Sequence, residues 1–278
     1  MSQIFAGESG FDYPCDVSSA PRDWDGAAYQ RLSDPQFRWG LRVLDSIELR
    51  GDECALDLGC GPGRLTAELL ERLPRGRVIA VDASPSMIAT ARRQLDRFGA
   101  RLSFLQGDLL SLELHSVADL AFSTATFHYI HDHDLLFRVI HRALKPGGRL
   151  VAQCGGGPNL ERIRGRSYQL MREPRFAPYF RDWRNPWNYT SPQETAQRLR
   201  AAGFVEIETG LEEAPITLDG LDAFREFARN VVVRPYLAAI PDEASREDFL
   251  NALVAQAAGD TPPFTLDYWR LNMRAKRS

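Results

Sequence analysis

The sequence predicts an α/β fold in which helices flank a parallel sheet. Between residues 53 and 154, short apolar runs of strand length alternate with stretches whose apolar residues recur at helical spacing. A glycine-rich turn follows the first of these runs. Strands that alternate with helices are joined by right-handed crossovers and form a parallel sheet. The length of 278 residues and the hydrophobic content of 44% suit one large domain with elaborations.

Local signals place the elements of this half. Ser84 and Pro85 supply an N-cap and a first-turn proline for a helix that we expect to end at Gly99. The next helix is expected at 135–144, closed by a turn at 145–148. The apolar runs predict five strands, at 54–58, 78–81, 102–105, 119–122 and 150–153.

The second half of the sequence is less regular. Residues 155–190 combine glycines, prolines and aromatic residues, and predict an irregular or short-helical insertion over the sheet. A capping box at 191–194 begins a helix that ends at Gly203. Beyond it we expect a strand at 204–209, helices at 221–232 and 242–258, and a long final strand at 264–276. The predicted single domain, 1–278, thus has a helical lead (1–49), a core (50–154) and cap segments (155–190 and 211–262).

Composition argues against several classes of protein. The net charge of −3 and the pI of about 6.0 lack the basic footprint of a nucleic-acid-binding protein. The four cysteines form no C-x-x-C pair, which fits neither a disulfide framework nor a zinc site and favours a reducing cytoplasm. The sequence has neither a signal-peptide pattern nor an apolar run near the roughly 20 residues that cross a bilayer. We therefore expect a soluble, cytoplasmic protein without a nucleic-acid or membrane partner.

The segment 56–64, Leu-Asp-Leu-Gly-Cys-Gly-Pro-Gly-Arg, is the most informative part of the sequence. Gly59, Gly61 and Gly63 occupy the turn between a strand and a helix, where residues without a Cβ let a ligand approach the backbone. The dinucleotide fingerprint G-x-G-x-x-G would need a glycine where Arg64 stands. This departure argues against a nicotinamide or flavin cofactor. A purely structural turn is the alternative interpretation of the glycines.

Two acidic residues follow the next strands. Asp82 ends the second strand, 23 positions after Gly59 (82 − 59), where a carboxylate can accept both hydroxyl hydrogens of a ribose. Its alternative role is an N-cap, although Ser84 already provides one. Asp108 follows the third strand and could accept a hydrogen bond from an adenine amino group, or serve as an ordinary turn aspartate. The carboxyl ends of these strands meet at the edge where open α/β folds bind ligands.

The motifs LDLGCGPG, VIAVDASPSM, QGDLL, FSTATFHYI and ALKPGGRLV, in this order and spacing, resemble the class I S-adenosylmethionine (SAM)-dependent methyltransferases over residues 50–154. The resemblance implies a Rossmann-like sheet of seven strands, mostly parallel, with an antiparallel last strand. It also implies that SAM is the cofactor and S-adenosylhomocysteine the product. The cofactor-binding residues implied are Gln36, Asp57, Gly59, Gly61, Gly63, Asp82, Ala83, Met87, Gly107, Asp108, Leu109, Ser123, Thr124 and Ala125.

The C-terminal part resembles the trans-aconitate methyltransferase group, whose relatives include the malonyl-carrier methyltransferases. The similarity rests on segments at 190–194, 202–204, 234–241 and 270–276. It implies a small-molecule acceptor and favours O-methylation of a carboxyl group. Methylation of a phenol, an amine or a carbon centre stays open, as does a SAM-binding protein without transfer activity. A methyltransferase of RNA or protein and an NAD-dependent dehydrogenase are more distant hypotheses.

His128 is the candidate catalytic residue. It follows the fourth strand, near the position expected for the transferred methyl group, and could act as a general base or be a structural histidine. Its neighbour Tyr129 could pack or touch the substrate. The histidines and acids at 131–134 invite a metal interpretation, but residues adjacent in sequence point in different directions and Asp132 or Asp134 suits a helix N-cap. We therefore predict no metal site.

Two further groups of side chains could belong to the site. In the N-terminal lead, Gln36 could reach the methionine end of SAM, or its helix could simply pack on the sheet. Trp24, Tyr29 and Trp39 belong to the same lead. The insertion after the fifth strand could form an aromatic pocket with an arginine for an anionic substrate, or the core of a small cap. Its candidate residues are Arg162, Arg164, Tyr168, Trp183, Trp187 and Tyr189.

Overall fold

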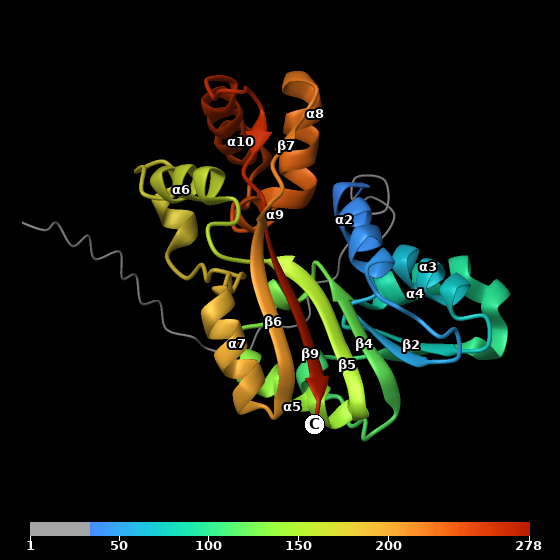
Figure 1. Cartoon of the computed structure of the whole chain (residues 1–278). Helices are drawn as coiled ribbons and strands as arrows, with labels where there is room; N and C mark the ends of the chain where they lie inside the picture. The colour runs from blue at the N-terminus through green and yellow to red at the C-terminus, as the bar shows by residue number, and fades with distance from the viewer. Residues whose placement is uncertain (1–33) are drawn as a thin grey trace, which may run out of the picture.

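The computed structural model describes residues 34–278 and confirms the predicted fold class. Seven strands form one sheet in the order β3-β2-β1-β4-β5-β9-β6 (Figure 1). β9 runs antiparallel to both of its neighbours, β5 and β6, whereas β1 to β5 pair with one another in parallel. The strands are β1 (Cys54–Leu58), β2 (Arg77–Asp82), β3 (Leu102–Gln106), β4 (Ala118–Thr124), β5 (Leu144–Gly155), β6 (Phe204–Glu213) and β9 (Trp269–Arg277).

Helices cover both faces of the sheet (Figure 1). On one face, α2 (Asp34–Asp45), α3 (Arg64–Arg72) and α4 (Pro85–Leu95) bury a core that is mostly aliphatic. On the other face lie α5 (His133–Ala143) and α7 (Pro192–Ala201), with a second core. The helical spacing of apolar residues turns one side of each helix toward the strands. No helix within residues 34–278 is both long and apolar enough to cross a membrane.

A cap lies over the carboxyl end of β5 (Figure 1). It contains a two-stranded sheet of β7 (Ile216–Thr217) and β8 (Thr265–Leu266) and the helices α6 (Glu161–Leu170), α8 (Gly220–Phe227), α9 (Arg234–Leu237) and α10 (Glu243–Ala258). A π-helical turn, Ala228–Val232, continues α8. The cap has its own core, rich in aromatic residues such as Phe176, Phe224, Tyr236 and Phe249. The cap is therefore held together by its own buried side chains as well as by the sheet below it.

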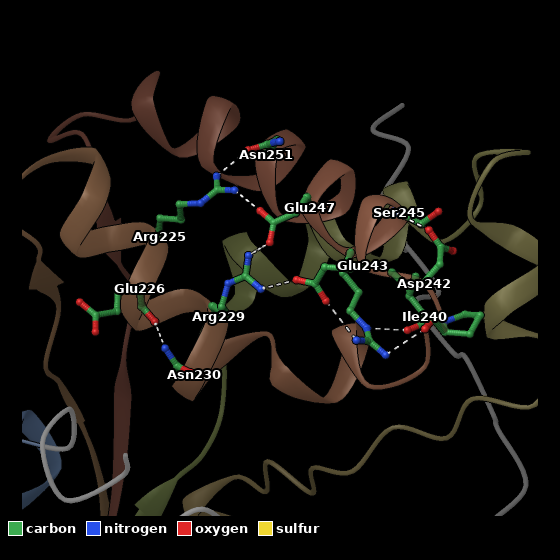
Figure 2. Close-up of polar contacts among 12 residues, drawn as sticks. Arg225, Glu226, Arg229, Asn230, Ile240, Asp242, Glu243, Ser245, Glu247 and Asn251 are labelled. Carbon is green, nitrogen blue, oxygen red and sulfur yellow. Dashed lines mark hydrogen bonds and ion pairs between the residues drawn. The ribbon is translucent and has the colours of Figure 1, made fainter. Parts of the chain in front are cut away.

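Ion pairs tie α8 and its π-helical continuation to α10 on the outer side of the cap (Figure 2). Glu247 accepts hydrogen bonds from both Arg225 and Arg229. Glu243 pairs with Arg229 at 3.2 Å and with Arg246 at 3.1 Å. These side chains are partly exposed, so water and salt screen their attraction. They connect two elements that are neighbours in space rather than in sequence.

The predicted helix starts are confirmed by their capping hydrogen bonds. Ser84 Oγ accepts from the backbone N of Met87 at 3.3 Å, with Pro85 in the first turn. Ser191 and Glu194 form the capping box of α7. Asp132 accepts from Leu135 N at 2.8 Å and caps α5, one of the two caps expected there.

Three predicted boundaries were wrong. The final strand expected at 264–276 is two strands, β8 and β9, separated by residues 267–268. These two residues contact the cap instead of pairing in the sheet: the Asp267 carbonyl accepts a hydrogen bond from Leu160 N at 2.9 Å. The helix expected to reach Gly99 ends at Leu95 and continues as a 3₁₀ helix, Asp96–Arg101. The turn expected at 145–148 is part of β5. The insertion 155–190 contains the short helices that were expected, α6 and a 3₁₀ turn at Ala177–Phe180.

Candidate active site

In the glycine-rich turn after β1, the outer two glycines are tightly packed and the middle one borders open space. Gly59, Gly61 and Gly63 all have positive φ, at 79°, 54° and 89°. A Cβ at Gly59 would lie 2.1 Å from the Oγ1 of Thr126, and one at Gly63 would lie 2.7 Å from the Leu95 side chain. A Cβ at Gly61 would meet no atom within 4 Å. The outer glycines are therefore required by packing, whereas Gly61 borders open space.

Asp82, at the end of β2, lies beside this opening. Its Oδ2 accepts a hydrogen bond from Gly61 N at 2.8 Å and its Oδ1 accepts from Ser84 N at 2.9 Å. Burial raises the pKa of Asp82 above its ordinary value, although these N–H donors, with that of Ala83, act to lower it. The Asp82 carboxylate is thus held in a fixed orientation at the carboxyl edge of the sheet.

Asp57 lies buried beneath the same turn, 3% exposed. Burial raises its pKa to about 7, the charge of Asp82 adds to this rise, and a 2.6 Å hydrogen bond donated by Thr66 Oγ1 opposes it. Asp57 therefore supports the turn from below, with one carboxylate oxygen bonded to Thr66.

The side chain of Met87, another residue expected to contact the cofactor, is buried at the start of α4.

The ends of β3 and β4 complete this edge. Gly107 N donates to the carbonyl of Asp82 at 3.0 Å, and a Cβ at Gly107 would meet no atom within 4 Å. Asp108 accepts from Leu110 N at 2.9 Å and caps the 3₁₀ turn Leu109–Ser111, the ordinary role of a turn aspartate. Ser123 Oγ donates to the carbonyl of Leu58 at 2.6 Å and joins β4 to β1.

A pocket lies between this edge and the cap. Six of its lining residues come from the N-terminal helix, from the segment that follows β4, and from β9 with the residue before it, and the cap segments contribute the other six. The first group is Gln36, Ala125, His128, Tyr129, Tyr268 and Arg270, and the second is Asn159, Leu160, Trp187, Tyr189, Val231 and Val232. Gln36 Oε1 is buried and has no hydrogen-bond partner among the described residues. The pocket therefore offers an unused acceptor as well as donors.

His128 lies in this pocket with a defined tautomer. Gly155 N donates to His128 Nδ1 at 3.2 Å, so in the neutral ring Nε2 carries the proton. The ring lies against Tyr129 and Tyr189, with centroid distances of 4.3 and 5.7 Å. Burial lowers the pKa of His128 well below its ordinary value, and the charge of Arg270 lowers it further. His128 is therefore a neutral hydrogen-bond donor.

Comparisons with known proteins agree with this architecture. A family model described as a methyltransferase domain matches residues 55–148. A trans-aconitate 2-methyltransferase of Methylobacterium nodulans is 32% identical over 92% of this chain and 99% of its own length. A second, from an Azoarcus species, is 29% identical over 86% of this chain and 91% of its own length. The chain belongs to the trans-aconitate 2-methyltransferase family. It is a SAM-dependent methyltransferase.

Solved structures show the same fold. Phosphoethanolamine N-methyltransferase 2 of Haemonchus contortus, in complex with phosphomonomethylethanolamine and S-adenosylhomocysteine, superposes with a TM-score of 0.61 at 19% identity. The match covers 91% of this chain and 56% of that one. A second structure of that enzyme, in complex with S-adenosyl-L-methionine, has a TM-score of 0.59.

The residues of this methyltransferase fit SAM. The space beside Gly61 and Gly107 flanks the fixed carboxylate of Asp82, and such backbone without side chains can admit a nucleoside. The unpartnered Gln36 Oε1 can accept a hydrogen bond from the ammonium group of the methionine portion. Ala125, with a φ of 56°, turns the chain after β4 next to this end of the pocket.

The insertion residues considered for the substrate divide into two groups. Trp187 and Tyr189 line the pocket, and the Arg164 guanidinium lies 4.8 Å from the Tyr189 ring centre. Arg162 instead approaches Asp260 and Asp267, both at 3.8 Å. Tyr168 and Trp183 pack on Tyr236 in the cap core. Trp39 packs against Tyr268, whereas Trp24 and Tyr29 lie outside the described residues.

Sequence reasoning did not select Arg270 as a site residue. It lies on β9, opposite Gly155 of β5, and its side chain is in the pocket. Its strand also carries Arg274, Lys276 and Arg277, so no signal in the sequence set Arg270 apart.

The histidines at 131–134 form no metal site among the described residues. His133 is buried and its Nε2 donates to the carbonyl of Phe127 at 2.9 Å, which joins the start of α5 to the preceding turn.

Proposed function

We propose that this methyltransferase transfers the methyl group of SAM to a carboxylate oxygen of a small anionic acceptor. The composition of the pocket carries the proposal. Arg270 and His128 line it as hydrogen-bond donors, and none of its described lining residues is an aspartate or glutamate. Around Arg270 and His128, such a lining attracts an anionic acceptor and disfavours a cationic one. The related enzymes of Methylobacterium nodulans and Azoarcus carry the name trans-aconitate 2-methyltransferase, which supports the same class of acceptor.

The state of His128 favours a carboxylate over a phenol or an amine. SAM, when bound, supplies the activated methyl group on its sulfonium. A carboxylate is already ionised at neutral pH and needs no general base, whereas a phenol or ammonium group must first lose a proton. His128 Nδ1 already accepts from Gly155 N, so its pocket-facing role is donation from Nε2. We propose that this N–H orients the reacting carboxylate, and that the cap keeps water out.

The same proposal assigns the cofactor-binding residues. Asp82 holds the ribose hydroxyls, the turn at 107–109 borders the adenine, and Gln36 with residues 123–125 binds the methionine end. The glycine turn supplies the open backbone and Asp57 supports it from below. Within one domain, the core (50–154) then binds the cofactor, while the cap segments (155–190 and 211–262) complete the acceptor pocket around His128 and Arg270.

The proposed setting is a reducing cytoplasm, with a small molecule rather than a nucleic acid or a membrane as the partner. Cys54, Cys60 and Cys154 are buried free thiols, which is the usual state of cysteines in a reducing compartment. The net charge of −3 is that of a protein without an overall attraction for phosphate backbones.

Transfer of label from methyl-labelled SAM tests the proposal directly. The acceptor panel contains small polycarboxylates, including trans-aconitate, together with acyl thioesters, phenols, amines and bulk RNA. We expect label in a small product that is released by mild base, as a methyl ester is. Label in a base-stable phenol or amine product would overturn carboxyl methylation and make His128 the first residue to re-examine as a base.

A further inference from the structure

Arg270 is the one arginine among the described lining residues of the pocket, and its orientation is fixed. The residue is 2% exposed. Its Nε donates to Gln153 Oε1 at 3.3 Å, and its guanidinium lies 4.7 Å from the centre of the Trp39 ring. A guanidinium that is held at Nε and stacked on a ring keeps its plane, and a planar fork can bind a carboxylate through two parallel hydrogen bonds.

Gln153 is itself oriented by a row of polar side chains across the sheet. Its Nε2 donates to Asn272 Oδ1 at 2.7 Å, and Asn272 Nδ2 donates to Glu212 Oε2 at 3.3 Å. The register of the strands explains the row, because Gln153 of β5 faces Asn272 of β9. With its amide nitrogen committed to Asn272, Gln153 can present only its carbonyl oxygen to Arg270. The neutral amide therefore positions the guanidinium without placing a charge beside it.

We propose that Arg270, positioned by Gln153, binds a second carboxylate of the acceptor, one that is not methylated. This inference rests on the proposed carboxyl methylation.

The chemistry of the two donors separates their roles. A bidentate contact with a guanidinium engages both carboxylate oxygens and weakens each as a nucleophile, so it suits a carboxylate that only anchors the molecule. A single donor such as His128 Nε2–H leaves one oxygen able to react. His128 and Arg270 are close enough for the arginine charge to affect the histidine, so one small molecule can reach both.

The experiment compares trans-aconitate with its three monoamides, in which one carboxylate at a time becomes neutral. For the wild-type enzyme we expect the monoamide of the reacting carboxylate to form no ester, and one of the other two to lose about 10²-fold in kcat/KM, the scale of a lost charged hydrogen bond at a buried site. Arg270→Gln should lose about 10²-fold on trans-aconitate and almost nothing further on that monoamide. Arg274→Gln, on the same strand but bonded to Ser46 rather than lining this pocket, is the matched control and should behave as wild type.

A second variant tests the positioning role. Gln153→Glu places a carboxylate against Arg270, and we expect it to compete with the acceptor and raise KM for trans-aconitate at least about tenfold with a smaller change in kcat. The dissociation constant of SAM, measured by calorimetry, should stay unchanged in both variants.

The outcomes separate this inference from the proposed function. Equal losses of Arg270→Gln on trans-aconitate and on both monoamides that still react would overturn the inference and leave carboxyl methylation standing. A SAM dissociation constant that rises as much as kcat/KM falls would assign Arg270 to the cofactor instead. If wild-type enzyme forms no methyl ester from any carboxylate, the proposed function fails and the inference fails with it. Should Arg270→Gln not fold, the monoamide comparison and Gln153→Glu still decide the question.

Discussion

The proposed cofactor edge and the proposed acceptor pocket of this methyltransferase are built in different ways. At the cofactor edge, consecutive residues of a few strand-to-helix turns supply exposed backbone and fixed carboxylates. The proposed acceptor pocket takes its side chains from segments scattered between residues 128 and 270. One region therefore depends on local backbone conformation, and the other depends on the way distant segments pack. A substitution in the glycine turn should change the stability of the turn and its affinity for SAM. A substitution in the acceptor pocket should change which acceptors are methylated.

The largest effect that we expect is a pH dependence centred on Asp57, beneath the glycine turn. Its pKa is about 7 in the folded protein against 3.8 for an ordinary aspartate, and burial is the main cause. As pH rises, the folded protein keeps the proton on Asp57 after the unfolded chain has lost it. The contribution of protonated Asp57 to stability is therefore fully present below pH 3.8 and is lost as pH rises toward 7. The free energy of unfolding should fall by about 1.4 kcal/mol per pH unit in that window, about 4 kcal/mol in all.

The measurement is urea unfolding between pH 5 and 8 for the wild type and Asp57→Asn. The amide cannot ionise, so the variant should lack this part of the slope. Parallel curves for the two proteins would show that Asp57 does not hold a proton in the folded state. A cap variant that leaves buried acids untouched, such as Glu226→Gln, should keep the wild-type slope.

Asp82→Ala should weaken SAM binding by about 10²-fold, or roughly 3 kcal/mol, since it removes the acceptor proposed for two ribose hydroxyls. Titration calorimetry with SAM measures this loss. At saturating SAM, KM for the acceptor should change little, which would separate the cofactor edge from the acceptor pocket. Asp96→Ala, exposed at the far end of α4, is the control. Unchanged affinity in Asp82→Ala would mean that the cofactor binds elsewhere.

The same contrast explains what the sequence could and could not reveal. The glycine turn and Asp82 were predictable because a few neighbouring residues determine the geometry of a strand-to-helix turn. Arg270 was not, because its approach to His128 depends on the antiparallel pairing of β9 with β5, more than a hundred residues away. Side-chain direction on a helix sets a similar limit. Arg162 and Arg164 are two residues apart on α6, about 200° around its axis, and only Arg164 stacks on Tyr189.

Within the turn, Gly59→Ala and Gly61→Ala should separate packing from ligand access. A Cβ at Gly59 would lie only 2.7 Å from the Cβ of Thr126, so a change of the Thr126 rotamer cannot remove the clash. We expect Gly59→Ala to lower the free energy of unfolding by about 2 kcal/mol. A Cβ at Gly61 meets no atom within 4 Å and should cost only the left-handed conformation, about 1 kcal/mol. Thermal unfolding and SAM titration of both variants make the test. Equal SAM affinity in Gly61→Ala and wild type would show that the space beside Gly61 does not admit the cofactor.

The smallest effect should come from the ion pairs on the outer side of the cap. Glu247 bonds both Arg225 and Arg229, yet these side chains are partly exposed, so Glu247→Gln should cost only about 0.5 to 1 kcal/mol in urea unfolding. The difference should shrink in about 1 M salt, which screens exposed charges. Glu226→Gln, on α8 next to Arg225 and with its side chain outside this network, serves as control. Arg229 lies two residues before Val231, which lines the pocket. A large rise in acceptor KM without loss of stability would therefore mean that the ion pairs position the π-helical turn. The acceptor pocket would then depend on contacts at the surface of the cap.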